Sequence, residues 1–238
     1  MLKVVVFDSG WGGDFVADYL SEELKTIEFI RVIDWKHAPY DCRSLAEIYE
    51  LTKQNLKRYI HKVDLIVLAG YTVSLFLQNL RERYPRQKFV GVSVNYYRIL
   101  KSRCYPKHIT LMGNDLLANS AFCSEVCQNL PHSSLAIPDC AGYEQLIDDG
   151  EMSLEILCTD LQTYFEINSK YVRHDLARRK RLIPSDVVLL LDTHFWSIKS
   201  EIEEVFGYNV AVFDFRQKLL RDVCVALDLL GVDGKRSK

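Results

Sequence analysis

Short apolar runs alternate with segments of helical period from one end of the chain to the other. Two series of runs can be recognised, at residues 2–7, 29–33, 65–69 and 89–93, and at 109–113, 134–137, 187–191 and 208–213. This alternation is the pattern of parallel strands joined by crossover helices. It predicts an α/β fold, and the two series predict two similar α/β domains.

The clearest predicted helix covers residues 43–62. Its apolar positions recur at helical spacing, which places them on one stripe, whereas Glu47, Lys53 and Lys57 fall elsewhere. The stripe consists of Leu45, Ile48, Thr52, Leu56, Tyr59 and Ile60. We therefore expect an amphipathic helix with one buried and one exposed face.

Composition fits this picture and limits the partners. The 238 residues are 48% hydrophobic, which is enough chain for one large domain or two small ones packed together. Thirty Lys and Arg residues nearly balance 32 Asp and Glu residues, so no overall field recruits nucleic acid or an anionic membrane surface. A partner must therefore be recognised locally.

No apolar segment approaches the length of a signal sequence core or of a membrane span. We expect a soluble cytoplasmic protein. The seven cysteines are scattered, and we expect reduced thiols. Cys123 and Cys127 have helical i, i+4 spacing, but no second pair accompanies them, so we expect them to be small core residues and not zinc ligands.

Polar residues follow the apolar runs where parallel α/β folds bind their ligands, outside the carboxyl ends of the strands. Residues 8–13 read DSGWGG, and further polar segments stand at 34–44, 70–74 and 192–197. The glycines at 8–13 lack both dinucleotide spacing and a Gly-Lys-Ser/Thr sequence, and Asp8 would repel phosphate. Proton transfer is the more natural use of this carboxylate.

Five segments together carry a resemblance to a known family. They are FDSGWGG (7–13), APYDCRS (38–44), LAGYTVS (68–74), CAGYEQLIDDG (140–150) and LLDTHFWS (190–197). In order and spacing they resemble glutamate racemase, of the aspartate/glutamate racemase superfamily, over nearly the whole chain. The resemblance implies two α/β domains with mainly parallel sheets, related by a pseudo-two-fold axis, with the active site in the cleft between them. We place the first domain at residues 1–93 plus 207–238 and the second at 94–206.

The resemblance also implies racemisation without pyridoxal phosphate, metal or any other cofactor, and a possible homodimer. In glutamate racemases one cysteine removes the α-proton and a second delivers a proton from the opposite face. The first cysteine position is Gly70 here, and the second is Asp192. Neither catalytic position supplies sulfur, so we expect no two-cysteine racemisation.

Other residues match the family's site or depart from it. Any remaining activity would fall to Asp8, Asp192 and His194. The residues expected around a substrate are Ser9, Pro39, Tyr40, Asp41, Tyr71, Thr72 and Thr193. The resemblance implies that Tyr71 replaces an asparagine that helps to hold the substrate, and we expect its ring to fill space that substrate and thiol would share.

Charge changes bear on the ligand. Asp41 replaces a glycine, and Asp148 stands where the family has glutamate. With Asp8 and Asp192, the additional carboxylate at 41 disfavours a dicarboxylate by like-charge repulsion, so a neutral or cationic amino-acid-like ligand fits better. Cys42 is expected to be structural, because its register points toward the start of a helix.

Two histidines and three aspartates of the polar segments after the apolar runs are candidate metal ligands: His37, His194, Asp8, Asp41 and Asp192. Their spacing follows the racemase scaffold and shows no metal-ligand motif, so no metal is expected.

Three functions stay open from the sequence. The first is a racemase-like pseudoenzyme that binds a small amino-acid-like molecule or a partner. The second is a divergent, cofactor-independent isomerase, decarboxylase or hydrolase that uses Asp192 with Asp8 and His194 as acid and base groups. The third is an oligomeric interaction protein with exposed Trp and Tyr residues at its interface.

Overall fold

The computed structural model describes residues 1–40, 43–92, 107–113, 121–140, 142–168, 185–207 and 209–229. The chain divides into two compact units. Unit 1 consists of Met1–Ser93 and Phe215–Lys238, and unit 2 of Val94–Asp214. Each unit contains one four-stranded sheet in which every pairing is parallel. The predicted α/β class with two similar domains is confirmed.

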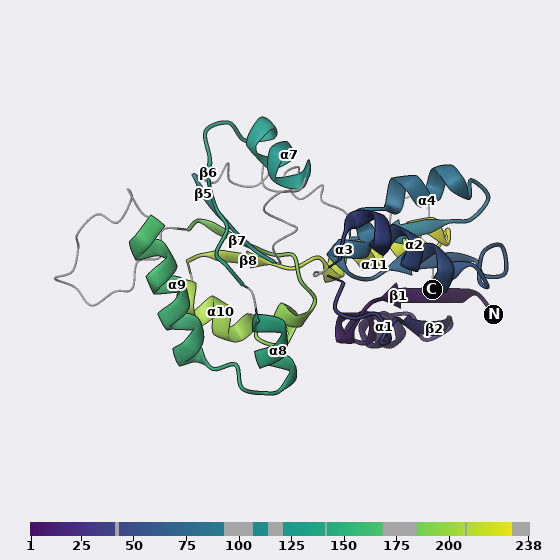
Figure 1. Cartoon of the computed structure of the whole chain (residues 1–238), viewed down its shortest axis with the longest axis horizontal. Coiled ribbons are helices and arrows are strands. Elements are labelled where there is room, and N and C mark those ends of the chain that lie inside the picture. The colour runs from purple at the N-terminus through teal and green to yellow at the C-terminus, as the bar shows by residue number, and fades with distance from the viewer. Residues whose placement is uncertain are drawn as a thin grey trace. The chain divides into compact units, whose positions relative to one another are not determined.

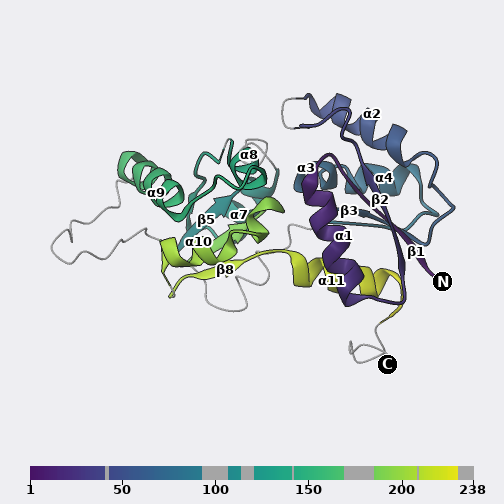
Figure 2. The ribbon, with the colours of Figure 1, turned by 90° about the horizontal axis from the view of Figure 1, so that it is seen from below.

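In unit 1 the strand order is β2-β1-β3-β4. The strands are β1 (Lys3–Asp8), β2 (Glu28–Ile33), β3 (Leu65–Leu68) and β4 (Phe89–Gly91). The helices are α1 (Trp11–Glu23), α2 (Leu45–Leu56), α3 (Tyr71–Ser74), α4 (Leu77–Arg83) and α11 (Arg216–Ala226). Figure 2 shows α1 and α11 on one face of this sheet and α2 and α4 on the other.

In unit 2 the order is β6-β5-β7-β8, so the two sheets share one topology. The strands are β5 (His108–Met112), β6 (Ser134–Ala136), β7 (Val187–Leu190) and β8 (Ala211–Phe213). The helices are α7 (Ala121–Asn129), α8 (Tyr143–Asp148), α9 (Leu154–Asn168), the 3₁₀ turn η2 (His194–Trp196) and α10 (Lys199–Phe206). In Figure 1, α7 covers one face of this sheet, while α9 and α10 lie on the other.

The expected domain boundary at residue 207 assigned β8 to the first domain. In the structure β8 pairs with β7 and completes the sheet of unit 2. The chain enters unit 1 again at Phe215, just before α11.

The central strands are apolar because helices cover both of their faces. Residues 4–7 of β1, all of β3 and all of β7 have no exposed surface. Strands buried on both faces need continuous apolar sequence rather than alternation, which explains why these runs stand out in the sequence. In unit 2 the core extends from β7 to α9 and α10 through Leu157, Leu161, Ile202 and Phe206.

The predicted helix at 43–62 is shorter in the structure. Ser44 caps α2, since its hydroxyl accepts a hydrogen bond from the Glu47 amide, and the Glu47 carboxylate accepts one from the Ser44 amide. The helix ends at Leu56. Residues 57–62 then form turns, in which His61 has a positive φ of 61°. Ile48, Thr52 and Leu56 are buried as expected, whereas Leu45 is exposed.

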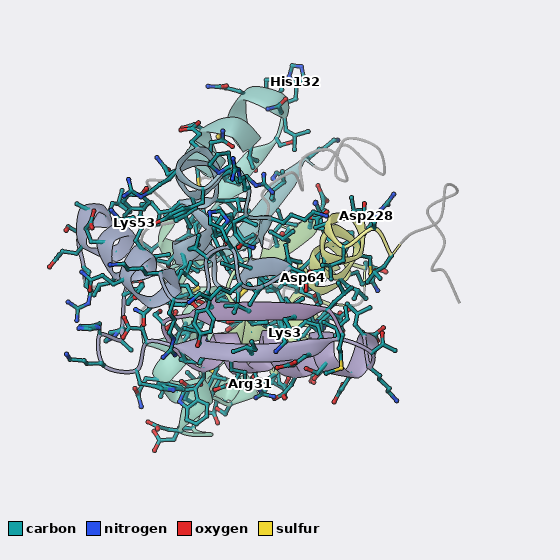
Figure 3. All side chains as sticks on the ribbon, turned by 90° about the vertical axis from the view of Figure 1, so that its right-hand side faces the viewer. Lys3, Arg31, Lys53, Asp64, His132 and Asp228 are labelled. Carbon is teal, nitrogen blue, oxygen red and sulfur yellow. The ribbon has the colours of Figure 1, made fainter. Side chains whose placement is uncertain are left out.

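Polar contacts join the strands of unit 1 to neighbouring segments, and Figure 3 labels Lys3, Arg31 and Asp64, which take part in them. Arg31, on the edge strand β2, forms ion pairs with Asp14 and Asp18 of α1. On the neighbouring strand, the Lys3 amide donates to the Asp64 carboxylate over 2.8 Å. Exposed ion pairs of this kind contribute at most about 1 kcal/mol each, so burial of the sheet dominates the stability.

The helices and the cysteines bear on two further expectations, the absence of a membrane span and the reduced state of the thiols. No helix in the described ranges is long and apolar enough to cross a membrane. In the part of the chain that the structure describes, Cys123, Cys127, Cys140, Cys158 and Cys224 form no disulfide. Cys127 is exposed, so only Cys123 of the pair on α7 is buried as expected.

Candidate functional site

The topology brings the ends of β1 and β3 together at the point where the strand order reverses. In parallel α/β sheets this switch point is the usual place for a ligand, outside the carboxyl ends of the strands. Phe7 pairs with Leu68, and the Ala69 amide donates to the Phe7 carbonyl over 2.8 Å. Asp8 and Gly70 therefore leave the sheet side by side.

The carboxylate of Asp8 occupies the space in which a side chain at residue 70 would begin. A Cβ built on Gly70 would lie 2.5 Å from Asp8 Oδ1 and 3.0 Å from its Cγ and Oδ2. Asp8 is buried, and its Oδ1 accepts a hydrogen bond from the Ser9 amide over 2.8 Å. A side chain at residue 70 would require this carboxylate to move.

Ser74 fixes the turn that follows Gly70. Its hydroxyl lies 2.7 Å from the Gly70 carbonyl and 3.0 Å from the Leu68 carbonyl, and it accepts the Val92 amide over 2.9 Å. Tyr71 and Thr72, both expected near a substrate, are each only 7% exposed at the start of α3. The edge around Gly70 is thus closely packed.

A polar network follows β2, and its central residue, Asp34, was not among the site residues expected from the sequence. The buried carboxylate of Asp34 accepts hydrogen bonds from the Tyr40 hydroxyl (2.7 Å), His37 Nδ1 (2.8 Å) and Asn55 Nδ2 (2.9 Å). Burial alone would raise the pKa of Asp34, but the bonds from Tyr40, His37 and Asn55 together lower it. Burial, followed by the hydrogen bond to Asp34, raises the pKa of Tyr40, which therefore stays protonated and donates to Asp34.

This network positions the loop that was expected to contact a substrate. Tyr40 is almost fully buried with its hydroxyl turned to Asp34, and Pro39 is exposed. His37, a candidate in the metal site that was not expected to form, contacts Asp34. Asp41 and Cys42 lie outside the described residues.

In unit 2 the loop after β7 carries Asp192, Thr193 and His194. Asp192 Oδ1 accepts the His194 amide over 2.9 Å and lies 2.7 Å from His194 Nδ1. This Asx-type turn fixes the imidazole against the carboxylate. Thr193 and His194 are buried. The structure therefore brings together Asp192 and His194 as a pair in unit 2, and Asp8, Gly70 and Tyr71 in unit 1.

Helix α8 adds two carboxyl groups to the pair in unit 2. Asp148 Oδ1 lies 3.5 Å from His194 Nε2, and the Glu144 carboxyl forms a hydrogen bond with Asp192. Burial would raise the pKa of Asp192, but the hydrogen bonds and charge of His194, with the bond to Glu144, lower it to about 2. Burial raises the pKa of Asp148, and the charge of His194 only partly opposes this.

Three polar residues of these two groups were absent from the sequence-based site: Asp34, Asn55 and Glu144. Asp34 directly follows an apolar strand, so the carboxyl-end rule that identified Asp8 also applies to it. Glu144 stands four residues before Asp148, a spacing that places both on one face of a helix. Asn55 reaches Asp34 from α2 over 21 positions, and no local signal marks it.

An aromatic pair is exposed close to this edge of unit 1. Trp11 begins α1 and Trp35 follows β2, and their ring centroids lie 4.9 Å apart in an edge-to-face arrangement. Both side chains are about half exposed.

The chain is similar in sequence to glutamate racemases and in fold to solved racemase structures. The chain is 28% identical to the glutamate racemase of Roseobacter denitrificans, over 89% of this chain and 80% of that protein. No protein-family model matches the chain.

Two solved structures share the fold. Escherichia coli glutamate racemase, crystallised with L-glutamate and the activator UDP-MurNAc-ala, superimposes with a TM-score of 0.78 at 22% identity, covering 100% of this chain and 86% of that one. Picrophilus torridus aspartate racemase gives 0.58 at 13% identity, with 95% and 94% covered. The chain therefore has the fold of the solved glutamate and aspartate racemases, and its sequence is similar to that of glutamate racemases.

Proposed function

We propose that this chain binds a small amino-acid-like ligand at the carboxyl ends of its strands and does not carry out two-cysteine racemisation. The observation that carries this proposal is the packing at Gly70, where the Asp8 carboxylate lies in the space of a residue-70 side chain. The position that holds a thiol in the resembling family has no acid or base group of its own here.

The second cysteine position also supports the proposal. A racemase without a cofactor needs a base on one face of the α-carbon and an acid on the other. Asp192 offers a carboxylate, whose ordinary pKa of about 3.9 makes it a far weaker base than a thiolate of pKa about 8.5. Its Oδ1 is already occupied by the amide and the ring of His194.

Charge favours a ligand other than a dicarboxylate. Asp8 stands at the edge of unit 1, and Asp148 and Asp192 stand close to His194 in unit 2. Buried or half-buried carboxylates repel a second carboxylate at short range. We therefore propose a neutral or cationic amino acid, or a molecule with that chemistry.

A thermal-shift screen of the full chain tests the proposal. It compares L- and D-forms of neutral, cationic and dicarboxylic amino acids. A ligand at 100 times its Kd adds about 2.7 kcal/mol of stability, which is readily measured. We expect a neutral or cationic amino acid to raise the melting temperature, with no deuterium entering its α-position in D₂O. Stabilisation by glutamate alone, with exchange at its α-carbon, would refute the proposal.

A second candidate is supported by the Asp192–His194 contact. A carboxylate oriented by an imidazole, which in turn faces Asp148, resembles the acid/base groups of one-base enzymes. Such a protein would carry out decarboxylation, hydrolysis or a one-face isomerisation, with Asp8 as a further proton donor or acceptor. Turnover of any ligand found in the screen should then be abolished in Asp192→Asn, and turnover that survives this substitution would remove the candidate.

The exposed Trp11–Trp35 pair supports a homodimer as a further part of the proposal. Sedimentation velocity of the parent and of a Trp11→Ser variant tests it. We expect a dimer in the parent that weakens in the variant. A monomeric parent would exclude a stable homodimer.

A further inference from the structure

Helix α8 and the loop after β7 bring one imidazole and two carboxyl groups of unit 2 to one point. One potential ligand atom from each of Glu144, Asp192 and His194 lies within 4.8 Å of the others. Glu144 has no part in the function proposed above. The group also differs from the metal site considered from the sequence, which did not include Glu144.

We propose that Glu144, Asp192 and His194 form a binding site for a divalent transition-metal cation of the Mn²⁺ or Zn²⁺ type. His194 Nδ1 is the nitrogen that faces Asp192, at 2.7 Å from Oδ1. The hydrogen bond between the Glu144 and Asp192 carboxyl groups holds a proton, and a cation bound to both groups displaces it, so binding releases a proton.

The far side of the imidazole is arranged as in many metal sites. His194 Nε2 lies 3.5 Å from Asp148 Oδ1. A carboxylate that accepts the other ring N–H fixes the tautomer and orientation of a ligating histidine and makes its free nitrogen more basic. Asp148 is therefore a positioning residue for His194 and lies outside the three ligands.

Burial distinguishes this group from an ordinary exposed acidic cluster. The side chains of His194, Asp192 and Asp148 are only 9%, 13% and 21% exposed. Two carboxyl groups withdrawn from water and close together repel each other when both are ionised. A divalent cation offsets this repulsion at the place where two carboxyl groups and the ring nitrogen meet.

The donor set indicates which metal binds. One imidazole nitrogen and two carboxylate oxygens suit Mn²⁺ and Zn²⁺, whereas copper(I) and iron–sulfur clusters prefer thiolates. Three protein ligands also leave coordination positions for water or for a small molecule. The structure therefore favours an open site over a closed structural one.

Titration with Mn²⁺ is the most selective test, because Mn²⁺ has little affinity for the free cysteines of the chain. The full chain is treated with a chelator, dialysed and titrated with MnCl₂, and free Mn²⁺ is followed by its paramagnetic resonance signal. We expect one equivalent to bind, with release of protons that isothermal calorimetry detects in buffers of different ionisation enthalpy. A parent protein that binds no Mn²⁺ overturns the proposal.

Matched variants locate the ion. Glu144→Gln keeps the size of the side chain and removes a charged ligand, and Glu155→Gln makes the same change at an exposed position of α9. We expect affinity to fall at least about tenfold in Glu144→Gln and in Asp148→Asn, and to stay unchanged in Glu155→Gln. Equal affinity in the parent, Glu144→Gln and Asp148→Asn would place the ion elsewhere and refute the site.

Two controls keep this test decisive. Circular dichroism and melting temperature establish that each variant folds, and Asp148→Asn stands in for Glu144→Gln if the latter does not fold. Alkylation of the thiols should leave Mn²⁺ binding intact, and a loss on alkylation would contradict the donor set. The titration uses no amino-acid ligand, so its outcome is independent of the function proposed above.

Discussion

Replacing Gly70 with alanine tests the packing on which the functional proposal depends. The new Cβ would lie 2.5 Å from Asp8 Oδ1 and 3.0 Å from two further carboxyl atoms. The carboxylate can yield only by giving up its place in the buried edge and its hydrogen bond from the Ser9 amide. Overpacking of this kind costs about 1–3 kcal/mol.

Gly10 provides a matched control for this substitution. Like Gly70, it is a glycine at a helix N-cap two residues after the end of a strand of unit 1, with extended φ and ψ, and a Cβ there meets no atom within 4 Å. Gly10→Ala therefore reports the effect of alanine at such a cap without the clash. We expect Gly70→Ala to be less stable than Gly10→Ala by about 1–3 kcal/mol.

Differential scanning calorimetry and urea unfolding measure this difference. For a chain of this size, 1 kcal/mol corresponds to about 2–4 °C in melting temperature. Asp8→Ala removes the three carboxyl atoms near position 70, so a double-mutant cycle should show a coupling of about 1–3 kcal/mol between the two sites. Equal stability of Gly70→Ala and Gly10→Ala, or a cost that persists in the Asp8→Ala background, would refute the reasoning.

Two other substitutions test the polar contacts that hold this edge. Ser74→Ala leaves the buried Val92 amide without its hydroxyl acceptor and should cost about 1–3 kcal/mol in urea unfolding, whereas a cost near zero would show that the contact is unimportant. Asp34→Asn should cost about 1.5–3 kcal/mol at pH 7, because three donors lose a charged acceptor. The pKa of Asp34 is lowered in the folded state, so its stabilisation is complete above the unfolded pKa of about 3.9 and is lost as the pH falls through the folded pKa. The difference in melting temperature between the parent and Asp34→Asn should therefore be constant from pH 7 to 5 and decrease below about pH 4. A difference that already decreases between pH 7 and 5 would contradict this assignment.

The strands could be predicted from the sequence because a strand that is buried on both faces consists of consecutive apolar residues. Each expected run overlaps a strand, and the ends coincide or differ by one to three residues. The helix after Ser44 was predicted too long, because Tyr59 and Ile60 continue the apolar spacing although the backbone turns after Leu56. Apolar spacing reports burial, and partly buried turns can share the spacing of a helix.

The polar site was only partly predictable. Asp8 stands at the end of a strand, and this place along the chain was enough to select it, whereas the roles expected of Asp192 and His194 came from the resemblance to glutamate racemase. The Asp34 network and Glu144 depend on partners 21 and 48 positions away, and such pairings form only when the sheet and helices are assembled. The contact between Asp8 and the space at Gly70 is likewise a product of the β1–β3 register.

Hydrogen exchange at the α-carbon of glutamate tests the central claim most directly. L- and D-glutamate are incubated separately with the purified full chain in D₂O, and the loss of the α-proton signal is followed by proton NMR against a mock purification from cells without the protein. With Gly70 and Asp192 in place of the two thiols, we predict no exchange above the mock sample for either enantiomer. Exchange of both enantiomers at an enzymatic rate, with each converted to the other, would contradict the account.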